Sequence, residues 1–205
     1  MPEASRLQLP LETTLEDETA VRIRFVRPED KELIRRGLRE FSEESLYHRF
    51  FTPVITFSDE HLKYLTEVDY RDHCAIGILD ISEAEPHGIG LARYIRLKDE
   101  PNVAEAAVSI VDAYQGRGAG SLLLAALSQL GAENGINIFR GYLIDDNRRF
   151  IRYLSGLGAL RQQASGSVVE LDLPVYTCLE DIPITPETAK ARWAWERLRA
   201  AQQTA

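Results

Sequence analysis

The stretch VSIVDAYQGRGAGSLLLAALSQLGAENG, residues 108–135, decides how this chain folds. It passes from an apolar segment through three closely spaced glycines into a leucine-rich segment. The residues that share one stripe at helical spacing are Leu122, Leu123, Ala126, Leu127 and Leu130. Asn134 and Gly135 then form a pair that is typical of a left-handed helix end. The stretch therefore predicts a strand, a glycine-dense turn and a helix with one apolar face.

The glycine-dense turn is suited to bind an anion. A strand that enters a helix without a polar capping side chain leaves the first N–H groups of the helix without partners. Glycines let a ligand approach these groups closely, and the positive partial charge at the helix start favours a phosphate or pyrophosphate. Glycines also serve tight packing of a strand against a helix, so a turn without a ligand is the alternative.

The segments around this stretch predict a mixed α/β fold with a mostly antiparallel sheet flanked by helices. Three apolar runs are joined by turns that are too short for a crossover, so we expect antiparallel strands. Only the helix after the glycines is expected to connect two parallel strands. The predicted strands are 21–25, 73–81, 87–97, 102–111 and 136–144, followed by a hairpin over 158–175. The predicted helices begin near residues 29, 42, 58, 121, 146 and 185.

Length and composition predict one domain with an extension at each end. A chain of 205 residues with 44% hydrophobic residues can bury one substantial core. Residues 1–19 are rich in acidic side chains with little periodicity, and are expected to form a solvated acidic arm. Residues 20–175 are the predicted domain. Residues 176–205 are a predicted C-terminal extension, whose helix has Thr185 as its cap and Pro186 at its first position.

The overall composition argues against several classes of function. A formal net charge of −8 disfavours a nucleic-acid-binding surface, which normally carries a basic excess. No segment has the apolar length of a membrane span or the pattern of a signal peptide. Cys74 and Cys178 are predicted to be free thiols, and the four histidines show no metal-ligand spacing. We therefore expect a cytoplasmic protein without a nucleic-acid, membrane or metal partner.

Three phosphate-binding patterns compete for the glycine turn. The nucleotide-hydrolase loop GxxxxGK[ST] fails because no lysine follows the glycines. The dinucleotide fingerprint GxGxxG matches at Gly116 and Gly118, but its third glycine falls on Ser121 and the preceding strands are antiparallel. The pattern QxxGxG matches at Gln115, Gly118 and Gly120. In this form the turn resembles the coenzyme A pyrophosphate loop of the GNAT acetyltransferase superfamily.

The resemblance extends over residues 21–172. The segments SEESLYHRFF, EVDYRDH, LARYIR and AEAAVSIVDAYQGRGAG are similar to the catalytic domain of bacterial protein lysine acetyltransferases. This resemblance implies acetyl-CoA as the co-substrate and an amine acceptor, either a protein lysine side chain or a small molecule. It is compatible with a monomer or a homodimer. A non-catalytic module that binds acyl-CoA as a sensor is the alternative from a different class.

The resemblance also implies which residues hold acetyl-CoA. Backbone groups of Val108, Ser109 and Ile110 would line the acetyl group and the pantetheine arm, with one N–H polarising the thioester carbonyl. Asn147 would touch the pantetheine arm, and is also suited to cap the helix that follows it. Arg117 would add charge to a phosphate. The loop that would hold the pyrophosphate consists of Gln115, Gly116, Arg117, Gly118, Ala119, Gly120 and Ser121.

Glu105 is the predicted general base. A lysine amine is protonated at neutral pH because its unperturbed pKa is about 10.4, so a base must take its proton. Glu105 lies on a strand among small apolar residues, where we expect partial desolvation, which makes a carboxylate a stronger base. The resemblance gives this glutamate the same role, while a solvent-facing glutamate is the alternative.

The sequence assigns no general acid. Many GNAT enzymes place a tyrosine seven residues after the asparagine to protonate the leaving thiolate, but here that position is Leu154. Tyr153 is one residue away, which is a rotation of about 100° on a helix.

Overall fold

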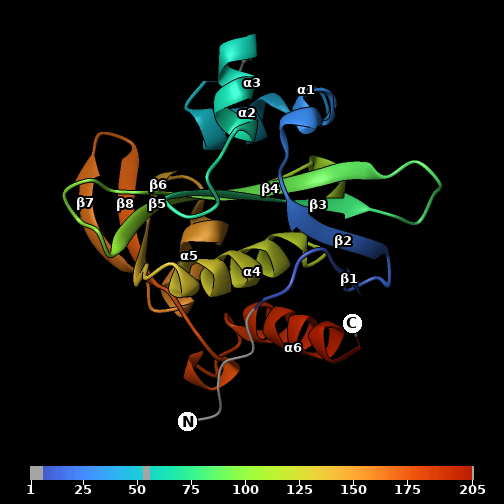
Figure 1. The fold of residues 1–205 in the computed structure, drawn as a ribbon. Coiled ribbons are helices and arrows are strands. Elements are labelled where there is room, and N and C mark those ends of the chain that lie inside the picture. The colour runs from blue at the N-terminus through green and yellow to red at the C-terminus, as the bar shows by residue number, and fades with distance from the viewer. Residues whose placement is uncertain (1–6, 53–55, 205) are drawn as a thin grey trace.

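A computed structural model of the chain describes residues 7–52 and 56–204, which form an eight-stranded sheet with helices on both faces (Figure 1). The strands are β1 (Leu11–Thr14), β2 (Ala20–Phe25), β3 (His73–Asp80), β4 (His87–Arg96), β5 (Val103–Ile110), β6 (Ile138–Ile144), β7 (Leu160–Ser165) and β8 (Val168–Pro174). The helices are α1 (Lys31–Leu38), α2 (Glu43–Phe50), α3 (Asp59–Thr66), α4 (Ala119–Glu133), α5 (Arg148–Gly156) and α6 (Ala189–Thr204). Short 3-10 helices are η1 (Pro28–Asp30), η2 (Asp112–Tyr114) and η3 (Leu179–Asp181).

The sheet confirms the predicted fold class. Its order is β1-β2-β3-β4-β5-β6-β8-β7, and neighbouring strands are antiparallel except β5 and β6. The parallel pair is connected by α4, the helix that follows the glycines. The predicted single parallel crossover is therefore confirmed for the part of the chain that the structure describes.

Helices cover the two faces of the sheet unequally (Figure 1). On one face, α4 lies between the sheet and α6, so it buries residues around its whole circumference, including Leu122, Leu124 and Leu127. On the other face lie α1, α2 and α3, and within the described chain α1 and α2 bury no residue completely. The main core therefore lies on the α4 face, and the opposite face has a thinner cover.

The N-terminal segment differs from its prediction. Over the described residues 7–19, the expected solvated arm is wrong, because β1 pairs with β2 at the edge of the sheet. Leu7, Leu11 and Leu15 are buried, with Leu11 opposite Ile23. Each buried leucine contributes about 1.5–3 kcal/mol, and the acidic side chains between them stay at the surface at little cost. The boundaries proposed at residues 19 and 175 remain predictions.

The C-terminal helix begins later than predicted. The structure starts α6 at Ala189, whereas the sequence places Pro186 in its first turn. Thr185 and Thr188 exchange backbone-to-hydroxyl hydrogen bonds of 3.0 and 3.3 Å, which form a turn of their own before the helix. Trp195 of α6 is buried in the core, and Trp193 packs against the glycine loop described below.

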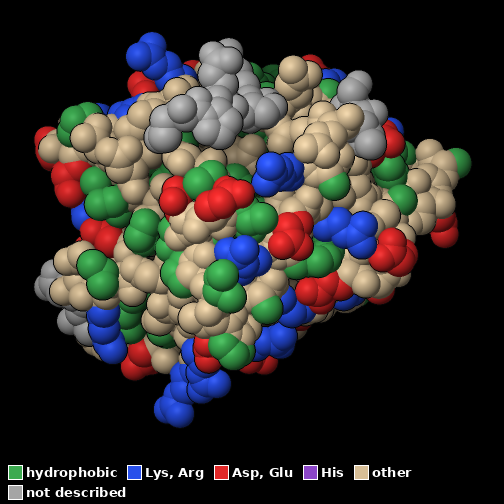
Figure 2. All heavy atoms as spheres, turned by 90° about the horizontal axis from the view of Figure 1, so that it is seen from below, with side chains coloured by type: hydrophobic (Ala, Val, Ile, Leu, Met, Phe, Trp, Pro, Cys, Tyr) green, Lys and Arg blue, Asp and Glu red, His purple; other side chains and the backbone are tan. Residues whose placement is uncertain are grey.

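The face that carries α6 shows charges of both signs (Figure 2). Ion pairs there include Lys190 with Glu16 and Arg197 with Glu18. On the atoms coloured in this view, basic and acidic side chains alternate rather than forming a basic stripe. None of the described helices is long and apolar enough to cross a membrane.

Candidate active site

Strands β5 and β6 separate soon after they meet. They pair only from Val103 to Glu105 on β5 and from Ile138 to Arg140 on β6. Beyond Glu105, β5 continues to Ile110 paired with β4, while β6 continues to Ile144 paired with β8. The β5 backbone from residue 106 to residue 110 therefore has one edge that no described strand occupies. Main-chain N–H and C=O groups on such an edge are ready partners for an extended ligand.

The residues predicted to hold the acyl arm lie on this open edge. Val108, Ser109 and Ile110 are all partly buried, and their side chains alternate between the two faces of the sheet. Val108 and Ile110 pack against the core on the α4 side. Ser109 faces the other side, where its hydroxyl accepts a hydrogen bond from Arg49 of α2. The structure thus brings the three residues to one place, and their role in ligand binding remains a prediction.

The glycine loop leads from β5 into the first turn of α4. Gly116 and Gly118 have φ of +77° and +95°, a region that side chains with a Cβ rarely adopt. A Cβ on Gly118 would stand 2.5 Å from Cζ3 of Trp193, so only glycine fits. Gly118 is the N-cap of α4, and no side chain caps this helix. The first N–H groups of α4 are therefore available to an anion, as the sequence predicts.

Two side chains of the loop have other partners than expected. The Gln115 amide donates to Ser45 Oγ and to the carbonyl of Ile110, which fixes the loop to α2 and to the end of β5. Arg117 donates to Asp17 and Thr19 and lies over the ring of Tyr114. A hydrogen bond from Arg117 lowers the pKa of Asp17 to about 2.

These contacts give the Arg117 guanidinium protein partners, and the expectation that it adds charge to a phosphate stays a prediction. Its guanidinium is held by the turn between β1 and β2, which sequence analysis did not foresee because it read residues 1–19 as an arm. From α6, Lys190 donates to the Gly116 carbonyl over 2.6 Å. The N-terminal hairpin and the C-terminal helix therefore both support the loop from outside.

Helix α5 brings an arginine that sequence analysis missed. Nη2 of Arg149 lies 3.7 Å from the point where a Cβ on Gly116 would stand. Arg149 is exposed in the first turn of α5, two residues after Asn147. The signal was present in the sequence as the run DNRRF at a predicted helix start, but only the fold shows that this turn faces the glycine loop.

Asn147 begins α5, and Tyr153 lies on the side of this helix that faces the first turn of α4. Asn147 is the N-cap residue of α5 but its side chain does not cap the helix, so the alternative role as a capping side chain is wrong. The Tyr153 hydroxyl donates to Ser121 Oγ over 3.0 Å, and burial raises its pKa. Leu154 is buried in the core. Thus Tyr153, rather than its neighbour, faces the first turn of α4.

Glu105 lies on the opposite face from α4 and its side chain is exposed. Because the Glu105 side chain is exposed, the expectation that it is partly desolvated is wrong. Its neighbours Ala104 and Ala106 point to the α4 face, because successive side chains of a strand alternate, and so they do not cover it. Ala107, which shares its face, is too small to do so. Glu105 faces solvent, as the alternative interpretation predicted. Its role as a general base stays a prediction.

Two arginines stand on the same face as Glu105. Arg93 of β4 is only 6% exposed and lies opposite Ala107 of β5. Its guanidinium is 2.5 Å from Nε2 of His73 and lies over the ring of Tyr64. Burial and the charge of Arg93 lower the pKa of His73 to about 4, so the neutral imidazole accepts the hydrogen bond at neutral pH. In the sequence, Arg93 and Arg49 stand only as members of the similar segments LARYIR and SEESLYHRFF, with no role of their own.

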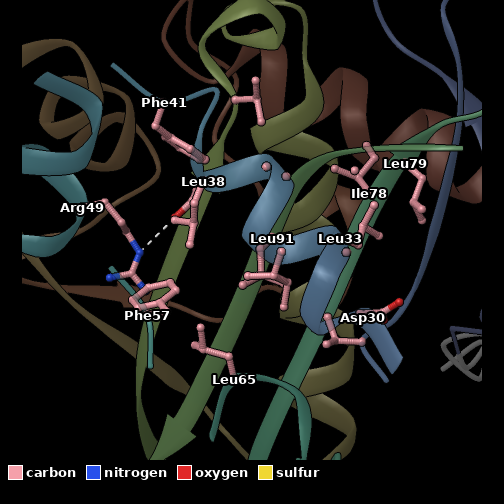
Figure 3. Close-up of a pocket in the computed structure, with 18 of the residues that line it drawn as sticks. Asp30, Leu33, Leu38, Phe41, Arg49, Phe57, Leu65, Ile78, Leu79 and Leu91 are labelled. Carbon is pink, nitrogen blue, oxygen red and sulfur yellow. Dashed lines mark hydrogen bonds between the residues drawn. The ribbon is translucent and has the colours of Figure 1, made fainter. Parts of the chain in front are cut away.

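Arg49 stands between this face and an apolar cavity. Its Nε donates to Ser109 Oγ over 3.0 Å, and burial together with the charge of Arg93 lowers its pKa to about 10. The cavity of about 90 Å³ lies between α1–α3 and the sheet, with Arg49 and Ser109 in its wall (Figure 3). The apolar side chains around it include Leu33, Leu38, Phe41, Phe57, Leu65, Ile78 and Leu91. The wall is thus mainly apolar, with few polar groups, among them Arg49 and Ser109.

Comparison with known proteins places this arrangement in a family. The profile of the Acetyltransferase (GNAT) family matches residues 31–159. The chain belongs to the GNAT acetyltransferase family. The predicted resemblance is therefore confirmed, and the site lies on a GNAT fold.

Similar proteins sharpen this assignment. Acetyltransferase Pat of Mycolicibacterium smegmatis is 34% identical over 167 residues, which are 80% of this chain and 48% of that protein. Acetyltransferase PA5475 of Pseudomonas aeruginosa is 30% identical over 152 residues, or 73% of this chain and 80% of that protein. The GNAT domain of S. lividans PAT superposes with a TM-score of 0.72 at 26% identity, covering 80% of this chain and 95% of that domain. The chain thus spans about half the length of the first of these relatives.

Proposed function

We propose that this protein is an acetyl-CoA-dependent N-acetyltransferase whose acceptor is a protein lysine side chain. The observation that carries the proposal is the open edge of β5, which ends at the uncapped N-terminus of α4. An extended ligand with a pyrophosphate at one end fits such a site, since backbone groups receive its length and the helix N-terminus receives its charge. The solved structure of yncA from Salmonella typhimurium, which holds acetyl-CoA, shares the fold at 16% identity and a TM-score of 0.60.

On the donor side, the chain supplies mainly backbone groups. The N–H groups from Gly116 to Ser121 would bind the pyrophosphate, and Arg149 would pair with a phosphate oxygen. One backbone N–H among residues 108–110 would hydrogen-bond the thioester oxygen, where negative charge develops during attack. The Asn147 side chain would contact the pantetheine arm.

On the acceptor side, Glu105 would accept the proton of the attacking amine. The amine nitrogen forms a bond to the thioester carbonyl carbon, the carbon–sulfur bond breaks, and solvent supplies the proton of the leaving thiol. Because Glu105 is exposed, a bound acceptor or a relayed water must fill the space in front of it. The resemblance of its segments to bacterial protein lysine acetyltransferases supports a protein acceptor over a small amine.

A mass-spectrometric transfer assay tests the proposal. The protein and acetyl-CoA are incubated with lysine-containing peptides, with soluble cell extract and with polyamines, and acetylated products are identified. Acetylated lysine that is lost in Glu105→Gln supports the proposed function. Acetylation of polyamines alone would favour the small-amine alternative. Binding of acetyl-CoA without transfer to any acceptor would favour the sensor alternative.

A further inference from the structure

We call the face of the sheet that carries Glu105, opposite α4, the acceptor face, and the face of α4 the donor face. Two guanidinium groups on the acceptor face have only neutral partners among the described residues. Arg49 donates through Nε to a serine hydroxyl and lies 4.8 Å from the ring of Phe50. Arg93 contacts the neutral imidazole of His73 and the ring of Tyr64. Neither arginine forms an ion pair with a carboxylate of the described chain, although ten other arginines do so or contact a main-chain carbonyl. A cation that is removed from water and has no anionic partner destabilises the folded protein, unless a ligand neutralises its charge.

The register of the sheet places these groups beside Glu105. Arg93 lies opposite Ala107, and Ser109, which holds Arg49, is two residues further along the same face of β5. Glu105 is two residues away in the other direction. Burial lowers the pKa of both guanidinium groups. The negative charge of Glu105 raises both pKa values, and the positive charge of Arg93 lowers that of Arg49. Two positive groups therefore stand near one carboxylate: Arg93 on β4, and Arg49 on α2, which is held at Ser109 of β5.

The β6 side of Glu105 has the opposite character. Arg140, paired with Glu105 in register, forms ion pairs with Glu100, Glu170 and Asp172. One guanidinium thus faces three carboxylates, which leaves this side with an excess of negative charge. An incoming ammonium group is favoured on this side, and an anionic group is favoured on the side of Arg49 and Arg93.

We infer that Arg49 and Arg93 bind a carboxylate of the acceptor that lies next to the amine to be acetylated. This inference rests on the proposed function, because it names a feature of the same acceptor. The planar guanidinium fork is well matched to a carboxylate, and Arg49 is only partly buried. The carboxylate has two possible sources: an acidic side chain beside the target lysine in a peptide, or the carboxylate of a free amino acid.

Matched acceptors test the inference. One pair of peptides carries lysine flanked by glutamate or by glutamine, and a second pair is free lysine and lysine amide. We expect wild type to show kcat/KM about tenfold or more higher for the carboxylate-bearing member of one pair, the size of one charge-assisted hydrogen bond. The pair that shows the preference identifies the source. Equal kcat/KM within both pairs would overturn the inference while leaving the acetyltransferase proposal intact.

Substitutions of Arg49 and Arg93 distinguish recognition of a carboxylate from a structural role of these arginines. In Arg49→Gln and Arg93→Gln, the ratio within the preferred pair should fall towards one, while the dissociation constant of acetyl-CoA stays within about twofold. Arg49→Lys keeps the charge without the fork and should retain an intermediate ratio. Arg36→Gln, an exposed arginine on α1, is the matched control and should keep the full ratio. An equal loss of kcat/KM for both members of the pair would assign the arginines a merely structural role.

A binding experiment keeps the inference testable if no acceptor turns over. Calorimetry of the glutamate-flanked and glutamine-flanked peptides, and of lysine and lysine amide, is made with the protein saturated with coenzyme A. Tighter binding of a carboxylate-bearing member by wild type but not by Arg49→Gln supports the subsite even if the proposed function fails. Equal binding of both members of each pair would overturn it.

Discussion

The two faces of the sheet around β5 differ in the groups that they offer to a ligand. On the face of α4, a deep core supports the glycine loop, and the proposed contacts to acetyl-CoA are mostly with main-chain groups. On the face of α1–α3, the cover is thin, and the site is built from charged side chains such as Glu105, Arg49 and Arg93. Acetyl-CoA, the proposed donor, would be bound by a rigid main-chain site. The proposed amine acceptor would be recognised by particular side chains. The difference predicts that substitutions on one face should leave the function of the other nearly unchanged.

The largest effect is expected from Glu105→Gln. Removal of the base should lower kcat/KM by about 10²–10⁴-fold, while the affinity for acetyl-CoA stays the same, because Glu105 faces away from α4. Steady-state transfer kinetics and calorimetry measure the two quantities. Glu83→Gln, in the exposed turn after β3, is the matched control and should retain activity. Unchanged turnover in Glu105→Gln would remove the assigned base, and a parallel loss of acetyl-CoA affinity would break the separation of the two faces.

Gly118→Ala should be the most damaging single change on the donor face. The left-handed conformation costs about 1–2 kcal/mol for alanine, and the clash with Trp193 adds about 1–3 kcal/mol. We expect lower unfolding free energy in urea together with weaker acetyl-CoA binding. Gly135→Ala is the matched control, since its φ is +77° but no atom lies within 4 Å of the added Cβ. If both variants lose the same stability, the contact with Trp193 does not constrain the loop.

Arg149→Gln and Arg117→Gln compare the contributions of two arginines near the glycine loop to acetyl-CoA binding. Loss of one charge-assisted hydrogen bond, about 1.5–3 kcal/mol, should weaken acetyl-CoA binding about tenfold or more, measured by calorimetry at constant salt. Arg117→Gln should change this affinity less, since Asp17 and Thr19 already hold that side chain. The reverse order of the two effects would restore the role that the sequence alone gives to Arg117.

The smallest predicted effect is a pH dependence on the acceptor face. The folded pKa of His73 is about 4, below the value of about 6.5 for an unfolded histidine. As the pH falls from 6.5 to 4, the unfolded chain therefore takes up this proton first, and stability decreases. The urea midpoint of wild type should fall relative to that of His73→Asn as the pH falls from 6.5 to 4. A difference that stays constant over this window would show that His73 does not titrate in this way.

Sequence analysis predicted the donor face better than the acceptor face. The glycine loop, α4 and the open strand lie within residues 103–133, so local patterns suffice to find them. Backbone ligands also leave a clear mark, because glycines with positive φ are required there. The side-chain partners of Arg117 were missed because they come from a segment 98 to 100 residues earlier in the chain.

The acceptor face could not be assembled from local patterns. Arg49, Arg93 and Glu105 come from α2, β4 and β5, and only the register of the sheet brings them together. The exposure of Glu105 was misjudged because its small neighbours in sequence point to the opposite face. Tyr153 was set aside on a helix rotation, although its hydroxyl reaches Ser121. Each of these errors concerns where a side chain points, which depends on tertiary packing.

A crystal structure with coenzyme A bound tests the central claim most directly. The account predicts a pyrophosphate on the N–H groups of the first turn of α4, with Arg149 beside it and the pantetheine arm along the open edge of β5 towards Glu105. A pyrophosphate bound elsewhere, or an α4 N-terminus covered by protein side chains in the complex, would contradict it.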